Sequence, residues 1–282
     1  MNFEERKIKE IEHSRKRRSI LSNLERNSDT NIREEPSDLD ALICDKENFR
    51  KYFSNMKFYS IAKLSEEFKQ NWLRQKCKKS TKILDFGCGN GENGIFAAQC
   101  GSSVIGIDIS PEGVENANSN ANKFGVSNHC KFFAMDGENM SFADNTFDIA
   151  VEYGVLHHVD LRKAMSELSR VLKPEGEMIC VEALRHNPLI HLYRKMTPHL
   201  RTEWEVEHIL SVKDIGVIRE YFQEVNINFF HLTALAAVPF RKTRIFGFLR
   251  GFFDKIDNVL LKHKFLGKYG WIMILTISKP IK

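Results

Sequence analysis

The chain has 282 residues, of which 42% are hydrophobic and 28% charged, and it contains 21 Phe, 6 Tyr and 3 Trp. This apolar material is enough for a sizeable core and excludes a disordered or low-complexity chain. The net charge of +5 is too small to indicate nucleic-acid binding by itself. Widely spaced cysteines predict neither a metal site nor a disulfide framework, and no apolar run is long enough to span a membrane. We therefore expect a soluble, cytoplasmic protein.

The N-terminal part differs in composition from the rest of the chain. A helix is expected over Phe3–Leu24, followed by a polar linker, so that residues 1–47 form a charged segment. The basic run Arg15-Lys16-Arg17-Arg18 is interpreted as a solvated helix face, because acidic residues flank it. Two short amphipathic helices follow and predict a helical cap over residues 48–79.

Apolar strands and helices alternate from residue 80 to residue 183. This alternation predicts right-handed βαβ crossovers and a mostly parallel sheet. The expected strands are Lys82–Phe86, Ser103–Asp108, Lys131–Met135, Phe147–Glu152 and Glu177–Val181, and the expected helices are Gly91–Cys100, Pro111–Phe124 and Leu161–Leu172. Beyond them we expect helices over Leu189–Met196 and Lys213–Tyr221 and strands over Val225–Phe229 and Trp271–Ile277.

A glycine-rich turn follows the first of these strands. Gly87, Gly89 and Gly91 leave one side of the turn without side chains, so a ligand can lie against bare backbone at the carboxyl end of the strand. The functional interpretation depends on this turn.

Three aspartates surround that turn and indicate what the ligand is. Asp108 ends the second strand, where a carboxylate can accept hydrogen bonds from both hydroxyls of a ribose. Asp136 follows the third strand, where it can accept from an adenine amino group while Gly137 lets the backbone approach the ring. Asp85 would repel a phosphate but hold an ammonium group. These acids fit S-adenosylmethionine.

The stretch from Asp85 to Gly91 resembles the glycine-rich motif of class I S-adenosylmethionine-dependent methyltransferases, of the small-molecule, type 11-like kind. The resemblance covers residues 80–182, with matches in Ile105–Asp108, Asp136-Gly137, Phe147–Ile149, Gly154–Val159 and Leu168–Gly176. It implies an α/β fold, a Rossmann-like doubly wound seven-stranded sheet with the last strand antiparallel and helices on both faces. The methyltransferase domain would span 48–282, with a cofactor-binding core at 80–183 and an acceptor-site and lid region at 184–282.

The resemblance also implies how the cofactor is held. Asp85 and Gly87 would bind the methionine part and Asp108 the ribose, while Ile109 would pack on the adenine and Asp136 would bind its amino group. The expected cofactor-binding residues are Asp85, Gly87, Cys88, Gly89, Gly91, Asp108, Ile109, Asp136, Gly137 and Glu152.

A nicotinamide dehydrogenase is the alternative for the same turn. The run Gly89–Gly94 formally matches G-x-G-x-x-G, and Asp108 could hold a ribose there too. That fingerprint, however, begins two residues late after the strand, and Asp85 would lie where a pyrophosphate binds. The methyltransferase is therefore favoured.

The methyl acceptor is less well defined. Candidate bases are His157 and His158 after the fourth strand and Glu182 at the end of the fifth; further candidates are His186, His191 and Tyr193. The sequence after the fourth strand lacks the N/D-P-P-Y/F motif of enzymes that methylate nucleic-acid bases, and no metal-ligand spacing is present, since the acidic run at 203–208 is typical of a helix start. We expect a small-molecule acceptor and no nucleic-acid partner.

The segment between the last two strands adds a charged insertion. Between Pro239 and Gly270 it contains eight lysines and arginines against two aspartates. Its apolar residues Leu249, Phe252, Phe253, Ile256, Val259 and Leu260 recur at helical spacing. A lid that packs this stripe on the core is favoured, and a weak membrane-surface contact through residues 239–270 is the alternative. With such a contact, the chain could act on a lipid-like or prenylated acceptor. A separate alternative is a non-catalytic accessory protein that binds the cofactor.

Overall fold

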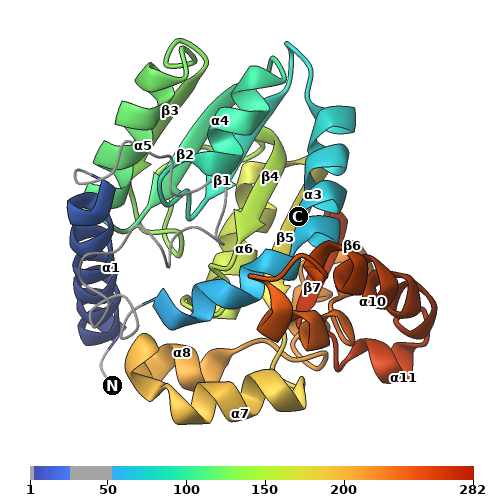
Figure 1. Ribbon diagram of the computed structural model, residues 1–282. Helices are drawn as coiled ribbons and strands as arrows, with labels where there is room; N and C mark the ends of the chain where they lie inside the picture. The colour runs from blue at the N-terminus through green and yellow to red at the C-terminus, as the bar shows by residue number, and fades with distance from the viewer. Residues whose placement is uncertain (1–2, 26–52) are drawn as a thin grey trace.

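The computed structural model describes residues 3–25 and 53–282, and the expected linker lies outside the described residues. Its centre is a seven-stranded sheet in the order β3-β2-β1-β4-β5-β7-β6 (Figure 1). Strands β1 to β5 run parallel, and β7 runs antiparallel between β5 and β6, which confirms the predicted doubly wound fold. The strands are β1 Lys82–Phe86, β2 Ser103–Asp108, β3 Cys130–Ala134, β4 Phe147–Tyr153, β5 Leu172–Ala183, β6 Phe222–Phe230 and β7 Ile272–Pro280.

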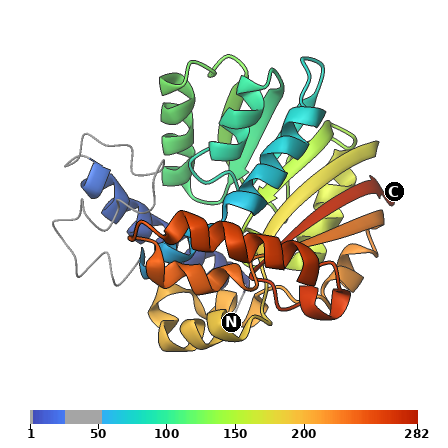
Figure 2. The ribbon, with the colours of Figure 1, turned by 45° about the vertical axis from the view of Figure 1, so that its right-hand side comes forward.

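Helices cover both faces of the sheet (Figure 2). They are α1 Phe3–Glu25, η1 Ser54–Ile61, α3 Lys63–Lys76, α4 Glu92–Gln99, α5 Pro111–Lys123, α6 Leu161–Val171, α7 Pro188–Met196, η2 Pro198–Leu200, α8 Glu203–His208, α9 Ile215–Ile218, η3 Ala234–Phe240, α10 Phe246–Leu260 and α11 Lys264–Gly267. Within residues 3–25 and 53–282, no helix is both long and apolar enough to cross a bilayer.

Alternating residues of the central strands belong to two separate hydrophobic clusters, one on each face of the sheet. Ile83 and Val151 point to the face covered by α3, α4 and α5, whereas Leu84 and Ala150 point to the face covered by α6 and α9. Because successive side chains of a strand point to opposite faces, strands buried on both sides are apolar throughout. Only the carboxyl ends of the strands carry buried acids.

Two helices begin where the sequence supplies a cap. The Ser110 hydroxyl accepts a hydrogen bond from the Gly113 N–H at 3.3 Å, and Pro111 occupies the first helical position of α5, as predicted. The Asp160 carboxylate accepts from the N–H groups of Arg162 and Lys163 at the start of α6. These caps fix where the chain turns from the carboxyl edge of the sheet into its covering helices.

The boundaries of two elements differ from those predicted. The helix expected over Lys213–Tyr221 is reduced to the single turn α9. Residues 173–176, expected to form a turn after α6, belong instead to β5. Leu172 already pairs with Phe147, and the Lys173 ammonium lies 2.5 Å from the Asp148 carboxylate, so the chain enters the sheet directly.

Candidate functional site

The glycine turn forms an open surface at the carboxyl end of β1. Gly87, Gly89 and Gly91 have φ angles of 67°, 57° and 86°, which side chains rarely adopt. A Cβ on Gly87 would lie 2.2 Å from the Val155 side chain, so this glycine lets the segment after β4 approach the turn. A Cβ on Gly89 would meet nothing closer than an Arg18 nitrogen at 3.8 Å. The turn therefore offers bare backbone to a ligand.

Asp85 lies beneath the turn with one oxygen unused. Its Oδ2 accepts a hydrogen bond from the Gly94 N–H at 2.9 Å, while its Oδ1 is buried with no hydrogen-bond partner among the described residues. Burial raises the pKa of Asp85 to about 7, against the opposing hydrogen bond from Gly94. An unpartnered oxygen of this kind fits the ammonium group of S-adenosylmethionine.

Asp108 and Asp136 are held in place by backbone N–H groups. Asp108 accepts from Gly89 and from Ser110, both at 2.8 Å, and so joins the glycine turn to the start of α5. Asp136 accepts from the Glu138 N–H at 2.9 Å. Both carboxylates are half-buried, as ribose and adenine ligands require, and the residues present thus fit the implied cofactor.

Three further residues expected at the cofactor site, Ile109, Gly137 and Cys88, are partly or fully buried beside the acids and the turn. Ile109 is half-buried beside Asp108. A Cβ on Gly137 would lie 2.6 Å from the Phe86 ring, so only glycine fits there. Cys88 is 4% exposed, and burial raises the pKa of its thiol, which stays protonated. Cys88 therefore supports the turn as a neutral group.

A pair of buried carboxyl groups lies where β4 and β5 end. Glu152 and Glu182 are both fully buried. Glu182 accepts from the Leu156 N–H at 2.6 Å, and its other oxygen lies 2.6 Å from Nδ1 of His157. Burial would raise the pKa of Glu182, but His157 and the hydrogen bond with Glu152 lower it more. Burial and the charge of Glu182 raise the pKa of Glu152. The pair therefore holds one proton, on Glu152, and one charge, on Glu182.

The second histidine has a different partner. Nδ1 of His158 lies 2.9 Å from the Glu10 carboxylate of α1. Burial lowers the pKa of His158, but the hydrogen bond with Glu10 and the charges of Glu205 and Glu10 outweigh burial and raise this pKa to about 9. Because His158 is a cation at neutral pH, the geometry favours His157 over His158 as a base.

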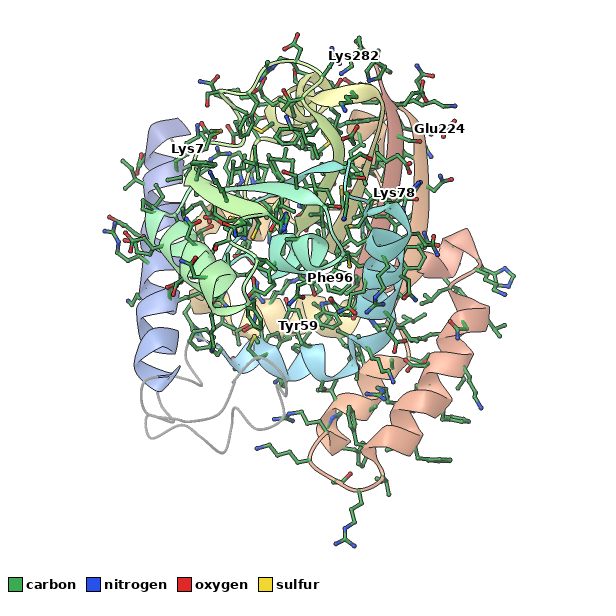
Figure 3. The ribbon with its side chains drawn as sticks, turned by 90° about the horizontal axis from the view of Figure 1, so that it is seen from above. Lys7, Tyr59, Lys78, Phe96, Glu224 and Lys282 are labelled. Atoms are coloured by element: carbon green, nitrogen blue, oxygen red, sulfur yellow. The ribbon has the colours of Figure 1, made fainter. Side chains whose placement is uncertain are left out.

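Helix α1 is docked across the carboxyl edge of the sheet, so the basic run predicted to be a solvated face is solvated only in part: Arg15 and Lys16 are exposed, whereas Arg17 and Arg18 are half-buried. Lys7, labelled on α1 in Figure 3, pairs with Asp136, the acid expected to bind adenine. Arg6 and Glu138 form an ion pair in which each side chain is 2% exposed. Arg18 donates to Asn90 in the glycine turn. Lys7 and Asp136 are 129 positions apart in the sequence. Contacts between such distant residues leave no local pattern in the sequence.

Lys69 of α3 is a further charged residue at the site that sequence analysis missed. It is 6% exposed, and its ammonium donates to Asn93 at 2.6 Å and pairs with Glu66 at 2.9 Å. The same ammonium lies 4.6 Å from the centre of the Tyr153 ring. Its charge also acts on Asp85. The only available signal was its position on the apolar side of an amphipathic helix.

The other candidates after β5 have structural roles or face solvent. Tyr193 is buried, and its hydroxyl lies 2.7 Å from that of Ser54. His191 is exposed on α7. Arg185 and Arg194 donate to the backbone carbonyls of Ile209 and Leu184. Arg185 and Arg194 are therefore anchored to the backbone of the segments around them.

Aromatic side chains gather near Glu182. The Tyr59 and Trp271 rings meet edge to face with centroids 5.4 Å apart, and Phe58 meets Tyr193 in the same way at 4.8 Å. Burial raises the pKa of Tyr59, and the charge of Glu182 acts on it in the same direction. Figure 3 labels Tyr59 on η1. These rings thus form an apolar cluster at the carboxyl edge of the sheet.

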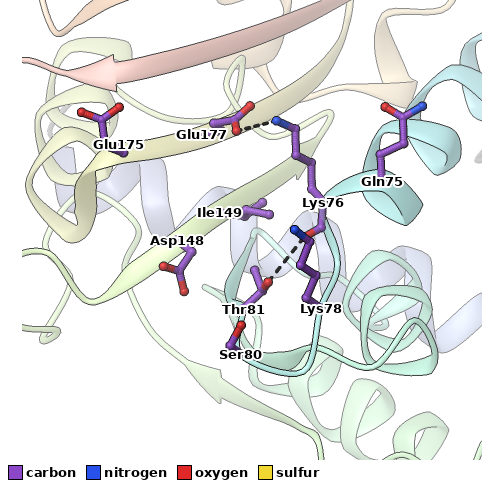
Figure 4. A pocket seen from close by; sticks show the side chains of 9 residues that line it. All are labelled: Gln75, Lys76, Lys78, Ser80, Thr81, Asp148, Ile149, Glu175 and Glu177. Carbon is purple, nitrogen blue, oxygen red and sulfur yellow. Dashed lines mark hydrogen bonds and ion pairs between the residues drawn. The ribbon is translucent and has the colours of Figure 1, made fainter.

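A cavity of about 480 Å³ opens at the opposite, amino-terminal edge of the sheet (Figure 4). Residues before or at the start of β1, β4 and β5 line it. Lys76 and Glu177 form an ion pair across it at 2.5 Å. Ligands of such sheets bind at the carboxyl ends of the strands, so we assign this cavity no role. In the described parts of the chain, no three His, Cys, Asp or Glu residues gather as a metal site would need.

Comparisons with known proteins agree with this geometry. Residues 84–180 match the sequence profile of a family described as Methyltransferase domain. A sterol 4-C-methyltransferase of Caenorhabditis elegans is 34% identical over 160 residues, which are 52% of this chain and 48% of that protein. A demethylmenaquinone methyltransferase of Bacteroides fragilis is 38% identical over 116 residues, 40% of this chain and 46% of that protein. The chain spans about half the length of these curated relatives.

A solved structure shows the same fold at lower identity. The geranyl diphosphate C-methyltransferase from Streptomyces coelicolor A3(2) superposes with a TM-score of 0.51 at 15% identity, covering 80% of this chain and 86% of that chain. The sheet order, the glycine turn and the family match lead to one conclusion. Residues 84–180 form a methyltransferase domain of the class I S-adenosylmethionine-dependent family.

Proposed function

We propose that this chain transfers a methyl group from S-adenosylmethionine to a carbon atom of an apolar small molecule. The observation that carries the proposal is the carboxyl pair Glu152–Glu182 with His157, next to the glycine turn. The names of the relatives support it, since one acts on a sterol carbon and one on demethylmenaquinone. The cysteines in the described residues are free thiols, which supports a cytoplasmic location.

The roles of the residues follow from what a carbon nucleophile needs. When bound, S-adenosylmethionine supplies a methyl group already activated by its sulfonium. An acceptor carbon must lose a proton, or have a neighbouring hydroxyl lose one, and a base assists that step. Glu182 holds the proton of His157 on Nδ1, so Nε2 remains the basic nitrogen. Glu182 then stabilises the imidazolium, and neutral Glu152 donates to Glu182 and keeps it in place.

The surroundings of the base indicate an apolar acceptor. Phe58, Tyr59 and Trp271 form an apolar cluster at the carboxyl edge of the sheet, where an acceptor would bind. Two arginines after β5, Arg185 and Arg194, donate to backbone carbonyls. We therefore propose a ring or prenyl chain as the acceptor, and no nucleic acid.

A lipid-like or prenylated acceptor taken from a membrane is the second candidate. The observation that favours it is the exposed apolar surface of α10, where Phe248 is 76% exposed. A non-catalytic role in cofactor binding is the third. Both use the same cofactor site as the first candidate. The second differs in taking its acceptor from a membrane, and the third in having no methyl acceptor.

Methyl transfer can be followed directly with S-adenosylmethionine that carries a trideuterated methyl group. The acceptors are sterols and prenylated quinols, with catechols as polar controls, and mass spectrometry locates the label. We expect label on carbon, and a roughly hundredfold or larger loss of product for Glu182→Gln and His157→Gln. His191→Gln, on the exposed side of α7, is the matched control and keeps activity. Label on oxygen or nitrogen, or no product despite tight cofactor binding, contradicts the proposal, and the second outcome favours the accessory role.

A further inference from the structure

Helix α10 is fixed to the body of the protein along one side. Leu249 and Phe253 pack against the hydrophobic core. The Asp257 carboxylate accepts hydrogen bonds from the N–H groups of Leu232, at 3.0 Å, and Thr233, at 2.7 Å. These two residues follow His231, the first residue after β6, and β6 ends at the carboxyl edge of the sheet. One side of the helix therefore covers the core near the candidate site, as a lid would.

The other side of α10 is apolar as well, and it is uncovered. Phe248 is 76% exposed, Phe252 51% and Val259 63%. They recur at intervals of four and seven residues, so they share one side of the helix. Ile245, 52% exposed, precedes this row, and Phe265, 69% exposed, follows it on α11. The single apolar stripe predicted from the sequence is thus divided between two sides, and we call the uncovered one, Ile245, Phe248, Phe252, Val259 and Phe265, the outer row.

In the same segment, the acidic side chains are buried and many of the basic side chains are exposed. Its two acids, Asp254 and Asp257, are 9% and 3% exposed. Its exposed charged side chains include Lys242, Arg244, Lys255 and Lys262. Asp257 accepts hydrogen bonds from backbone N–H groups and Asp254 pairs with Arg250, both on the covered side of the helix. The surface around the outer row is therefore positive.

We infer that the outer row docks this protein on the surface of an anionic lipid bilayer. Aromatic rings beside lysines and arginines are the combination by which an interfacial helix binds: the rings enter the boundary between headgroups and acyl chains, and the cations attract the phosphates. Isolated exposed apolar residues are ordinary, whereas a row of five ringed by cations marks an interaction surface. The charge selects an anionic bilayer as the partner.

Docking in this way brings the candidate site to the bilayer. Figures 1 and 2 show α10 at the same end of the molecule as α7 and α8, beyond the carboxyl edge of the sheet. An apolar acceptor could then pass from the lipid to the aromatic cluster at the carboxyl edge of the sheet without crossing water. This consequence rests on the proposed function, but the docking itself does not.

Vesicle flotation with the full-length chain tests the docking. We expect the chain to float with vesicles made of equal parts phosphatidylcholine and phosphatidylglycerol, and to remain behind with phosphatidylcholine alone. Phe248→Ser with Phe252→Ser, and separately Lys255→Glu with Lys262→Glu, should each reduce binding roughly tenfold or more. Phe124→Ser and Lys123→Glu, exposed on α5 away from the outer row, are the matched controls and should bind as the unaltered chain does.

The outcomes separate docking from catalysis. Titration of each variant with S-adenosylhomocysteine verifies that the cofactor site is intact, and transfer to a detergent-solubilised acceptor measures activity without vesicles. No binding to anionic vesicles, or equal binding by all variants, overturns the inference and leaves the proposed function standing. Self-association that the phenylalanine variants abolish, without vesicle binding, identifies the outer row as a contact between copies of this chain and also overturns it.

Discussion

Lys7 near the start of the chain and Asp136 after β3 form an ion pair across 129 positions of sequence. Asp136 is the acid expected to bind the adenine amino group, so Lys7 would compete with the cofactor for the same carboxylate. We expect Lys7→Met to tighten binding of S-adenosylhomocysteine about fivefold, because one charged competitor is removed. Calorimetric titration measures this, and Lys9→Met, on the same helix with its side chain 44% exposed, is the control. Weaker binding by Lys7→Met would show that Lys7 supports the cofactor instead of competing with it.

The ion pair between His158 and Glu10 predicts a pH-dependent attachment of α1. The pKa of His158 is raised from 6.5 to about 9 in the folded protein. Its contribution is therefore complete below pH 6.5 and is lost as the pH rises through about 9. Hydrogen exchange in α1, corrected for the intrinsic effect of pH, should accelerate across this window. In His158→Gln the acceleration should disappear, and a helix that stays equally protected in the unaltered chain at high pH contradicts the assignment.

Asp85 predicts that cofactor binding depends on pH in the opposite sense. Its pKa is raised to about 7, and only the ionised carboxylate attracts an ammonium group. Affinity for S-adenosylhomocysteine should fall below pH 7, approaching about tenfold per pH unit. Titrations in a series of buffers measure the slope. Asp85→Asn should bind weakly at every pH, and a slope that survives in this variant assigns the titration to another group.

The carboxyl pair predicts unequal costs for two similar substitutions. Glu152 is neutral, so Glu152→Gln replaces a protonated acid by a group of the same shape and should lower the free energy of unfolding by about 1 kcal/mol or less. Glu182→Ala leaves His157 and Glu152 without their buried partner and should cost about 3–5 kcal/mol. Denaturant unfolding at neutral pH compares them. Equal losses would mean that the proton is not on Glu152.

Gly87 and Gly101 offer a matched pair for the glycine turn. Both have positive φ angles, 67° and 99°, but a Cβ on Gly101 meets nothing within 4 Å, whereas one on Gly87 would lie 2.2 Å from Val155. Gly101→Ala should cost about 1 kcal/mol from backbone strain. Gly87→Ala should cost about 2–4 kcal/mol, because the segment after β4 must also move. Thermal unfolding of the two variants compares their losses of stability. Similar losses for Gly87→Ala and Gly101→Ala would contradict a contribution from crowding against Val155.

Local patterns accounted for most of the sheet and for the glycine turn. Strands such as Lys82–Phe86 are short apolar runs bounded by turns, and Ser110 with Pro111 marks a helix start within three residues. Both signals are contained in a few neighbouring positions. Asp85 and Asp108 could be placed beside the turn because they lie in the last two residues of their strands, and their roles in cofactor binding stay predictions.

Contacts between distant segments could not be predicted in this way. The docking of α1, the burial of Lys69 and the pairing of Glu152 with Glu182 depend on which side chains the finished fold brings together. The division of the α10 stripe into a covered and an uncovered side likewise depends on how η3 and β6 hold the helix. Amphipathic spacing shows that a side is apolar, but not what lies against it.

The helix laid across the glycine turn has a kinetic consequence. In the proposed reaction, the spent cofactor must leave before a fresh molecule binds, and we expect its exit to pass Lys7 and Arg18 of α1. We therefore expect detachment of α1 to limit the rate of the proposed turnover. Added salt, which weakens ion pairs at partly exposed side chains, should speed up release and raise the maximal rate before it harms the fold.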